Sequence, residues 1–251
     1  TCCQYLPSAS ALQFLTAQMQ GPRLDRILTI GNPTRMAYRS PLTDVVKSLR
    51  PLPYSTIEAK FIVGLFPTGQ ALVGDEATKA AVRAHLQQNY PILHFATHGY
   101  LSESAPLLSA LLLANGDALS LYELMGMQLN ADLVVLSACR TALGETTGGD
   151  DVLGLTRGLL AAGAKAAVVS LWPVDDASTS LLMSEFYRRL RDGEKPNQAL
   201  RLAQNHLRTL STAAIKRQTI QLKDAGFDDE LAPVDSYSPP FFWAPFILVG
   251  I

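Results

Sequence analysis

The 251-residue sequence has no long apolar run and few cysteines, and each absence excludes a class of protein. No stretch of about 18 apolar residues occurs, so no transmembrane helix is predicted. The opening segment TCCQYLPSASALQFL has neither a basic start nor a continuous apolar run, so it is not predicted to be a signal peptide. Two of the three cysteines, Cys2 and Cys3, are adjacent, which argues against a disulfide framework and favours a reducing, cytoplasmic location.

Strong net charge and metal-binding clusters are also missing. The formal net charge is −1 and Lys and Arg are dispersed, so the sequence lacks the basic surface typical of nucleic-acid-binding proteins. It has neither the Cys and His spacing of a zinc site nor the glycine-rich loop that binds phosphates. We therefore expect no metal, no cofactor, no nucleic-acid partner and no membrane partner. The hydrophobic fraction is 48%, which is enough apolar material for one large core.

Short apolar runs separated by helical patterns predict the fold class. Most of the runs are apolar throughout, which is typical of parallel strands with helices on both faces. Strands that alternate with helices imply βαβ units, so we predict one α/β domain, residues 1–251, with a mostly parallel sheet. The expected strands are 26–30, 92–97, 108–114, 133–138, 166–172 and 246–250. The expected helices are 55–66, 76–88, 151–162, 176–191 and 195–210.

Local signals predict some helix ends. Ser55, with Glu58 three residues later, predicts a capping box at the start of the helix 55–66. Gly163 and Gly193 follow two helical patterns and predict where those helices end. The polar segment 211–240 is predicted to be a surface excursion, whose first part can continue the preceding helix.

Two expected strands end in residues that can carry out chemistry. His98 follows one of them and Cys139 follows another. In open parallel sheets, functional sites form beyond the carboxyl ends of the strands, so neighbouring strands would place these two side chains together. An imidazole beside a thiol stabilises the thiolate, which is the nucleophilic form. The adjacent Gly99 lets the backbone approach closely, so that its N–H can face a developing oxyanion.

Each of these residues also has an ordinary structural interpretation. A single cysteine in an apolar run is often a small core residue, as Cys139 could be. A histidine at a strand end is often a hydrogen-bonded polar group, and we expect His94 to be a core histidine of this kind. The combination favours chemistry, because His98 and Cys139 both lie at the predicted edge, 41 positions apart. A caspase-type arrangement also has its histidine upstream, by about 50 residues.

Four motifs, in order along the chain, resemble a known family. They are HFATHGY, LVVLSACRTALGETTGGDDVLGLTRGLLAAGA, VVSLWPVDD and FFWAPFILVG. They are similar to the CHAT family of caspase-like cysteine peptidase domains, which are related to separase and often follow tetratricopeptide repeats. The resemblance implies a caspase-like three-layer αβα sandwich and a catalytic dyad of His98 and Cys139. It also implies an oxyanion hole formed by the N–H groups of Gly99 and Cys139, a protein or peptide substrate, and a tetratricopeptide-repeat or other regulatory partner.

The resemblance runs from Tyr5–Leu12 to the last residue, with two departures. Ala142 replaces a common glycine after the cysteine, a small change that leaves the nucleophile in place. The usual N-terminal portion of the family, with a strand and a PF segment, does not precede Tyr5. We therefore expect a fragment or a processed form of a longer protein.

Acidic residues near the same edge are candidates for the substrate pocket. Asp175 and Asp176 follow an expected strand, and Asp150 lies in the GGDD stretch before an expected helix. Separase-like enzymes hold an acid that takes arginine at the matching position, so the resemblance implies cleavage after Arg or Lys through a charge-assisted contact. The alternative is that these carboxylates only cap helices. Trp172 is either a wall of the pocket or a core residue.

The leading hypothesis is a cysteine endopeptidase. One alternative is a latent or catalytically silent interaction module on the same scaffold, activated by a partner. A weaker alternative is an acyl transferase or thioesterase that uses the same thiol.

Overall fold

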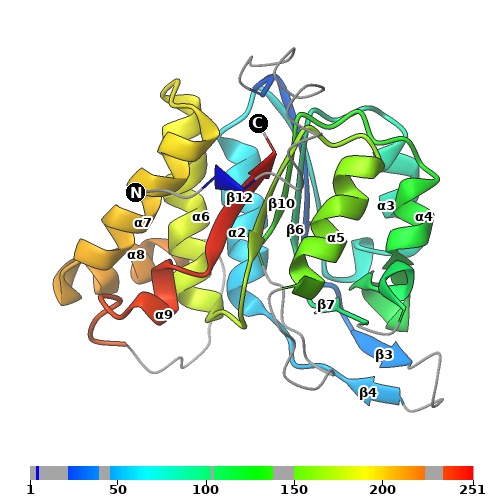
Figure 1. The fold of residues 1–251 in the computed structure, drawn as a ribbon. Coiled ribbons are helices and arrows are strands. Elements are labelled where there is room, and N and C mark those ends of the chain that lie inside the picture. The colour runs from blue at the N-terminus through cyan, green and yellow to red at the C-terminus, as the bar shows by residue number, and fades with distance from the viewer. Residues whose placement is uncertain are drawn as a thin grey trace.

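The chain folds around one sheet of seven strands with helices on both faces (Figure 1). The computed structural model describes residues 4–5, 22–39, 46–102, 105–137, 150–223 and 234–250. The strand order is β1-β12-β11-β10-β6-β2-β5, and neighbouring strands are parallel except for β11 and β12. The strands are β1 (Gln4–Tyr5), β2 (Arg26–Gly31), β5 (Thr68–Val73), β6 (Ile92–Ala96), β10 (Leu133–Leu136), β11 (Ala166–Ser170) and β12 (Phe246–Gly250).

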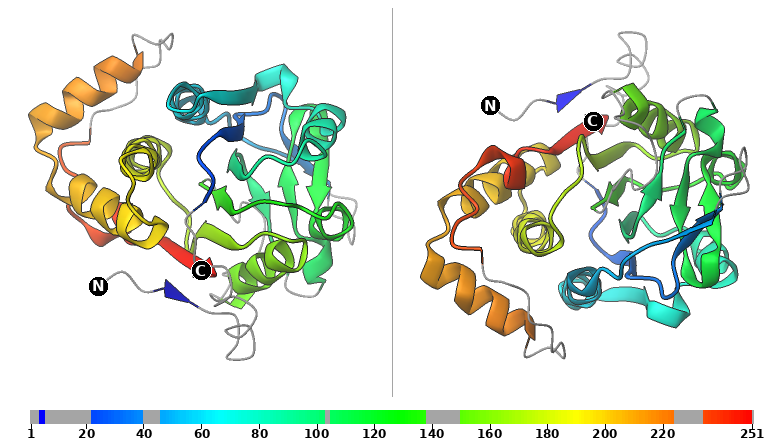
Figure 2. Two further views of the ribbon diagram at one scale, coloured as in Figure 1. Left: turned by 90° about the horizontal axis from the view of Figure 1, so that it is seen from above. Right: turned by 90° about the horizontal axis from the view of Figure 1, so that it is seen from below.

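The helices form two outer layers, as Figures 1 and 2 show. Helices α2 (Pro53–Gly64), α6 (Asp176–Arg191) and α7 (Pro196–Thr209) lie on one face of the sheet. Helices α3 (Lys79–Leu86), α4 (Leu121–Met125) and α5 (Asp150–Ala161) lie on the other. The predicted αβα sandwich with a mostly parallel sheet is therefore confirmed.

The two faces of the sheet have separate apolar cores, because successive side chains of a strand point to opposite faces. In β6, Leu93 and Phe95 belong to the core on the side of α3, α4 and α5. Ile92 belongs to the core under α2, α6 and α7. His94 shares the face of Ile92, so a buried polar side chain lies within the second core.

Most predicted elements are present, but the run 108–114 belongs to a different sheet from the parallel one in which it was expected. Helix α6 and strand β12 have the predicted bounds. The run 108–114 contributes only β8 (Ala110–Leu112), which pairs in a small antiparallel sheet with β7 (Gly99–Tyr100) and β9 (Ala118–Ser120). A short apolar run carries no signal that separates the two kinds of sheet. The remaining short elements are β3 (Ala37–Arg39), β4 (Val46–Ser48), and the 3₁₀ turns η2 (Gly74–Glu76), η3 (Pro106–Leu108) and η4 (Ala114–Gly116).

The predicted capping box at Ser55 is wrong. Helix α2 begins at Pro53, and its N-cap residue, Leu52, has no capping side chain. Ser55 and Glu58 lie inside the helix and are buried. Proline at the first helical position needs no hydrogen-bond partner for its nitrogen, so the helix can start there without a polar cap.

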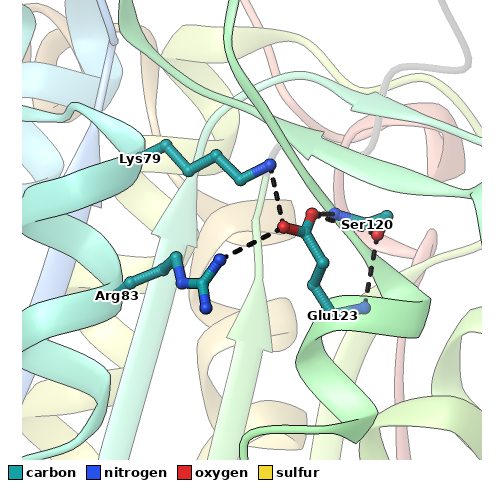
Figure 3. Close-up of polar contacts among 4 residues, drawn as sticks. All are labelled: Lys79, Arg83, Ser120 and Glu123. Atoms are coloured by element: carbon teal, nitrogen blue, oxygen red, sulfur yellow. Dashed lines mark hydrogen bonds and ion pairs between the residues drawn. The ribbon is translucent and has the colours of Figure 1, made fainter.

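A complete capping box occurs instead at the start of α4 (Figure 3). The Ser120 hydroxyl accepts from the Glu123 N–H, and the Glu123 carboxylate accepts from the Ser120 N–H. The same carboxylate pairs with Lys79 of α3 at 2.9 Å and with Arg83 at 3.4 Å. Burial opposes its ionisation, but these partners outweigh burial and lower the pKa of Glu123. The box therefore also ties α4 to α3.

The polar segment 211–240 begins with its own helix. Leu210 is extended (φ −61°, ψ 128°), so α7 ends and α8 (Thr212–Lys223) starts anew. The last helix, α9 (Pro240–Trp243), leads into β12. Residues 224–233 lie outside the described part of the chain.

Candidate active site

Strands β6 and β10 are neighbours, as the site hypothesis requires. They pair in parallel, with Ile92 opposite Leu133 and Phe95 opposite Leu136. This constant offset of 41 positions equals the separation of His98 and Cys139 in the sequence. The N–H of Ser137 donates to the carbonyl of Phe95 at 3.0 Å, so the ladder continues past β10. Cys139 itself lies outside the described residues.

The imidazole of His98 is oriented by a backbone carbonyl. Its Nε2 lies 2.8 Å from the carbonyl oxygen of Arg50, in the segment that leads into α2. A carbonyl can only accept a hydrogen bond, so Nε2 carries the proton in this contact. In the neutral ring, Nδ1 then holds the lone pair that a general base uses.

Asn32 positions the start of α2, and with it the segment that contains Arg50. Asn32 follows β2 in a left-handed conformation (φ 43°), and its N–H donates to the carbonyl of Ala96 at 3.1 Å. Its Oδ1 accepts from the N–H of Leu52 at 2.7 Å, and its Nδ2 donates to the Thr56 hydroxyl at 3.1 Å. Asparagine tolerates this conformation better than most residues. One side chain thus connects β2, the end of β6 and the first turn of α2.

The N–H of Gly99 is not used by the ladder between β7 and β8. Leu112 donates to the carbonyl of His98 at 2.9 Å, which makes Gly99 and Leu111 a non-hydrogen-bonded pair. The N–H of Gly99 therefore points away from β8. A Cβ at this position would lie 3.8 Å from the Ala110 carbonyl oxygen, an ordinary contact. Space alone does not require glycine here.

Of the acidic candidates, Asp175 caps a helix. It is the N-cap residue of α6, and its carboxylate accepts from the Ser178 N–H at 2.9 Å. Asp150 is the first residue of α5, and its side chain lies outside the described part of the structure. Trp172 follows β11, is partly buried, and donates from Nε1 to the carbonyl of Phe241 at 3.1 Å.

Asp176 connects α6 to the start of α2. One carboxylate oxygen accepts from the Tyr54 N–H at 2.9 Å, and the other accepts from the Ser55 hydroxyl at 2.9 Å. Burial raises the pKa of Asp176 to about 7, and the negative charges of Glu58 and Asp175 act in the same direction. An acid with such a pKa is ionised only in part at neutral pH.

A buried polar network lies beneath this edge. His94 Nε2 is 2.7 Å from Glu58 Oε1 of α2, and His94 Nδ1 is 3.1 Å from the hydroxyl of Tyr187 in α6. The Ser137 hydroxyl lies 3.5 Å from His94 Nε2. The expectation that His94 is a hydrogen-bonded core histidine is confirmed. Burial, and then the charge of Glu58, raise the pKa of Tyr187 well above its usual range.

The described residues contain no cluster of three or more His, Cys, Asp and Glu side chains suited to a metal ion. Among them, no helix has both the length and the apolar character needed to cross a membrane.

A sequence model of the CHAT domain matches residues 2–251. The chain belongs to the CHAT domain family. Two relatives are tetratricopeptide repeat protein 28 of Mus musculus, 32% identical over 187 residues, and of Homo sapiens, 30% identical over 237 residues. The alignments cover 60% and 80% of this chain, but it spans only 8% of the length of each relative.

Two solved structures have a similar arrangement of elements. The Saccharomyces cerevisiae separase–securin complex matches with a TM-score of 0.47 and 14% identity, over 96% of this chain and 13% of that one. The complex of the Porphyromonas gingivalis RgpB pro- and mature domains matches with a TM-score of 0.46 and 11% identity, over 90% and 47%. The structure itself has the α/β sandwich with a mostly parallel sheet that the motifs implied.

The structure of this CHAT domain also includes positions at the edge that sequence reasoning missed. The Arg50 carbonyl carries no side-chain signal, so no motif could have revealed it. Asn32 did carry one, because an asparagine before a proline, directly after a buried strand, marks a turn. In Figure 1 the carboxyl edge lies at the bottom, where β7 is found and where α2 and α6 begin.

Proposed function

We propose that this CHAT domain is a cysteine endopeptidase with His98 and Cys139 as its catalytic dyad. The observation that carries the proposal is the register of β6 and β10. If this offset continued for three residues beyond Phe95 and Leu136, it would bring His98 opposite Cys139. Family membership and the carbonyl-held imidazole support the same assignment.

The proposed mechanism uses the two nitrogens of His98 differently. Nε2 remains hydrogen-bonded to the Arg50 carbonyl, while Nδ1 takes the proton of the Cys139 thiol. The thiolate attacks the scissile carbonyl carbon, and the N–H groups of Gly99 and Cys139 hold the resulting oxyanion. The imidazolium then protonates the leaving amine as the C–N bond breaks. Water, deprotonated at Nδ1, hydrolyses the thioester and releases the thiol and the carboxylic acid.

We propose further that the substrate has Arg or Lys before the cleaved bond, and that Asp176 binds it. Both oxygens of Asp176 already accept from α2, but a carboxylate has about four acceptor sites, so capacity for a guanidinium remains. A bound guanidinium would also favour the ionised form of this acid, whose pKa is raised. Asp175 and Asp150 remain further candidates for the pocket, with Trp172 as a wall.

A second candidate function is a latent form of the same enzyme, activated by a partner. His98 is only 1% exposed and its Nδ1 is buried, which favours a form of the site that a rearrangement must open to a peptide. The two relatives are named for tetratricopeptide repeats, which makes such a repeat domain our proposed partner.

The experiment compares wild type with Cys139→Ala and His98→Ala, each incubated with a proteome-derived peptide library. Wild type should release new termini that follow Arg or Lys, and both variants should release none. Cys3→Ala is the matched control and should cleave like wild type. Unchanged cleavage by Cys139→Ala would rule out the proposal. Labelling of Cys139 without peptide cleavage would favour the latent enzyme, and turnover of thioesters alone would favour a thioesterase.

A further inference from the structure

Helix α2 buries polar side chains where apolar ones would be expected. Ser55, Thr56 and Glu58 all face the interior, and Glu58 is 0% exposed. Its Oε1 is hydrogen-bonded to His94, but its Oε2 has no hydrogen-bond partner within the described part of the chain. Apolar residues of similar volume often stabilise such a site equally well or better, so stability alone does not explain a buried Glu–His pair.

The contacts of Glu58 lead to the segment that carries the proposed nucleophile. Glu58 holds the ring of His94 at 2.7 Å, and the hydroxyl of the fully buried Ser137 lies 3.5 Å from the same ring nitrogen. Ser137 follows β10 and precedes Cys139 by two positions in the sequence. The same helix follows Arg50, whose carbonyl holds His98. Helix α2 therefore follows the carbonyl that holds His98 and, through Glu58, contacts the histidine beside the exit of β10.

We propose that Glu58 is a positioning residue, which acts through His94 to fix the exit of β10 relative to His98. The inference rests on the proposed dyad, because it concerns the geometry between that dyad's two members. A carboxylate at 2.7 Å fixes the rotation of the His94 ring, and Tyr187 holds the opposite nitrogen. A ring fixed at both nitrogens gives Ser137 a rigid surface to pack against. Misplacement of reacting groups by about 1 Å can cost on the order of 100-fold in rate.

The test replaces the polar pair by an apolar one, Glu58→Leu with His94→Leu, in a Cys2→Ser, Cys3→Ser background. Iodoacetamide alkylation of Cys139 is measured against pH, with His98→Ala as the reference for a lost imidazole. We expect the double variant to keep the urea midpoint of wild type while its alkylation profile shifts to higher pH, toward that of His98→Ala. Where peptide cleavage is measured, kcat should fall about 10- to 100-fold with KM unchanged.

Two further variants separate positioning from general packing. Glu58→Gln keeps an acceptor for His94 and should retain an alkylation profile close to that of wild type. Thr29→Val is the matched control: Thr29 lies opposite His94 in the neighbouring strand, but its hydroxyl donates to the Ala59 carbonyl of α2 at 3.1 Å and not to His94 or Ser137. It should lower stability and leave the profile unchanged.

The outcomes distinguish the two proposals. An alkylation profile that His98→Ala leaves unchanged would contradict the dyad itself. A shift with His98→Ala but none with the folded double variant would overturn only the role of Glu58. If the double variant does not fold, Ser137→Ala tests the inference instead. It removes the hydroxyl that lies beside His94, which is the last contact in the series from Glu58 through His94 to Ser137. A several-fold lower alkylation rate would support the inference, and an unchanged rate would overturn it.

Discussion

Asp176 shows how a single carboxyl group can serve both the fold and the proposed site. It follows β11 at the carboxyl edge and accepts hydrogen bonds from the backbone of Tyr54 and the side chain of Ser55 at the start of α2. Anions are favoured at a helix N-terminus, yet burial here raises the pKa to about 7. Desolvation is therefore the larger of the two opposing effects.

This shift predicts the sign of a pH dependence at Asp176. Its pKa is about 7 in the folded protein and 3.8 in its ordinary environment, so between these values the folded state binds the proton more tightly. The contribution of Asp176 to the free energy of unfolding is then fully present below about pH 4 and is lost as pH rises through about 7. Asp176→Asn lacks this titration. Urea unfolding at pH 4.5 and pH 8 should show wild type losing stability relative to the variant, and a relative gain would refute the shift.

The helices α3 and α4 are connected by the group of four side chains in Figure 3. Glu123→Gln keeps an acceptor for the capping box but loses the ion pairs with Lys79 and Arg83, so it should cost up to about 1 kcal/mol at low salt. Glu123→Ala also loses the hydrogen bond from the Ser120 N–H, although the bond from the Glu123 N–H to the Ser120 hydroxyl stays, and should cost about 0.5–1.5 kcal/mol more. Urea unfolding at low and high salt measures both. At high salt, the stability of Glu123→Gln should approach that of wild type, whereas that of Glu123→Ala should not. If the two variants lost the same stability at both salt concentrations, the separation into ion-pair and capping contributions would be wrong.

Local sequence patterns predicted a helix well where its polar residues bond to residues nearby in the chain. Helix α6 carries an apolar stripe and starts beside the capping Asp175, so its bounds followed from the sequence. Helix α2 began earlier than expected because Ser55 and Glu58, which resemble a capping box, have partners distant in the chain. Strand β5 was missed because it lies at the edge of the sheet and its first residues are exposed.

The two edges of the sheet differ in what their polar groups do. At the carboxyl edge, His98 and Cys139 were predicted as a pair on the condition that their strands are neighbours, and the pairing of β6 with β10 meets that condition. The Arg50 carbonyl and the amide of Asn32 were not predictable, because they depend on how segments distant in sequence pack. We expect substitutions at the carboxyl edge to change the rate of catalysis more than they change the free energy of unfolding.

At the amino edge, one carboxylate joins three segments of the chain. Asp132, just before β10, accepts from the side chain and backbone of Arg23 at 2.8 and 3.0 Å and pairs with Lys165, just before β11, at 2.7 Å. Burial opposes ionisation of this group, but these partners outweigh burial and lower the pKa of Asp132. Its contribution to stability is therefore present above the ordinary pKa and is lost as pH falls.

Asp132→Asn should thus destabilise the whole molecule without altering the chemistry. The loss of charge-assisted hydrogen bonds should lower the free energy of unfolding by about 1.5–3 kcal/mol at pH 7. Because the wild-type carboxylate is protonated in acid, the difference between the two proteins should shrink as pH falls through its lowered pKa. Urea unfolding across pH measures this, and the alkylation profile of Cys139 should stay that of wild type. A shifted profile in the folded variant would contradict the separation of the two edges, because Asp132 lies at the opposite ends of the strands from His98.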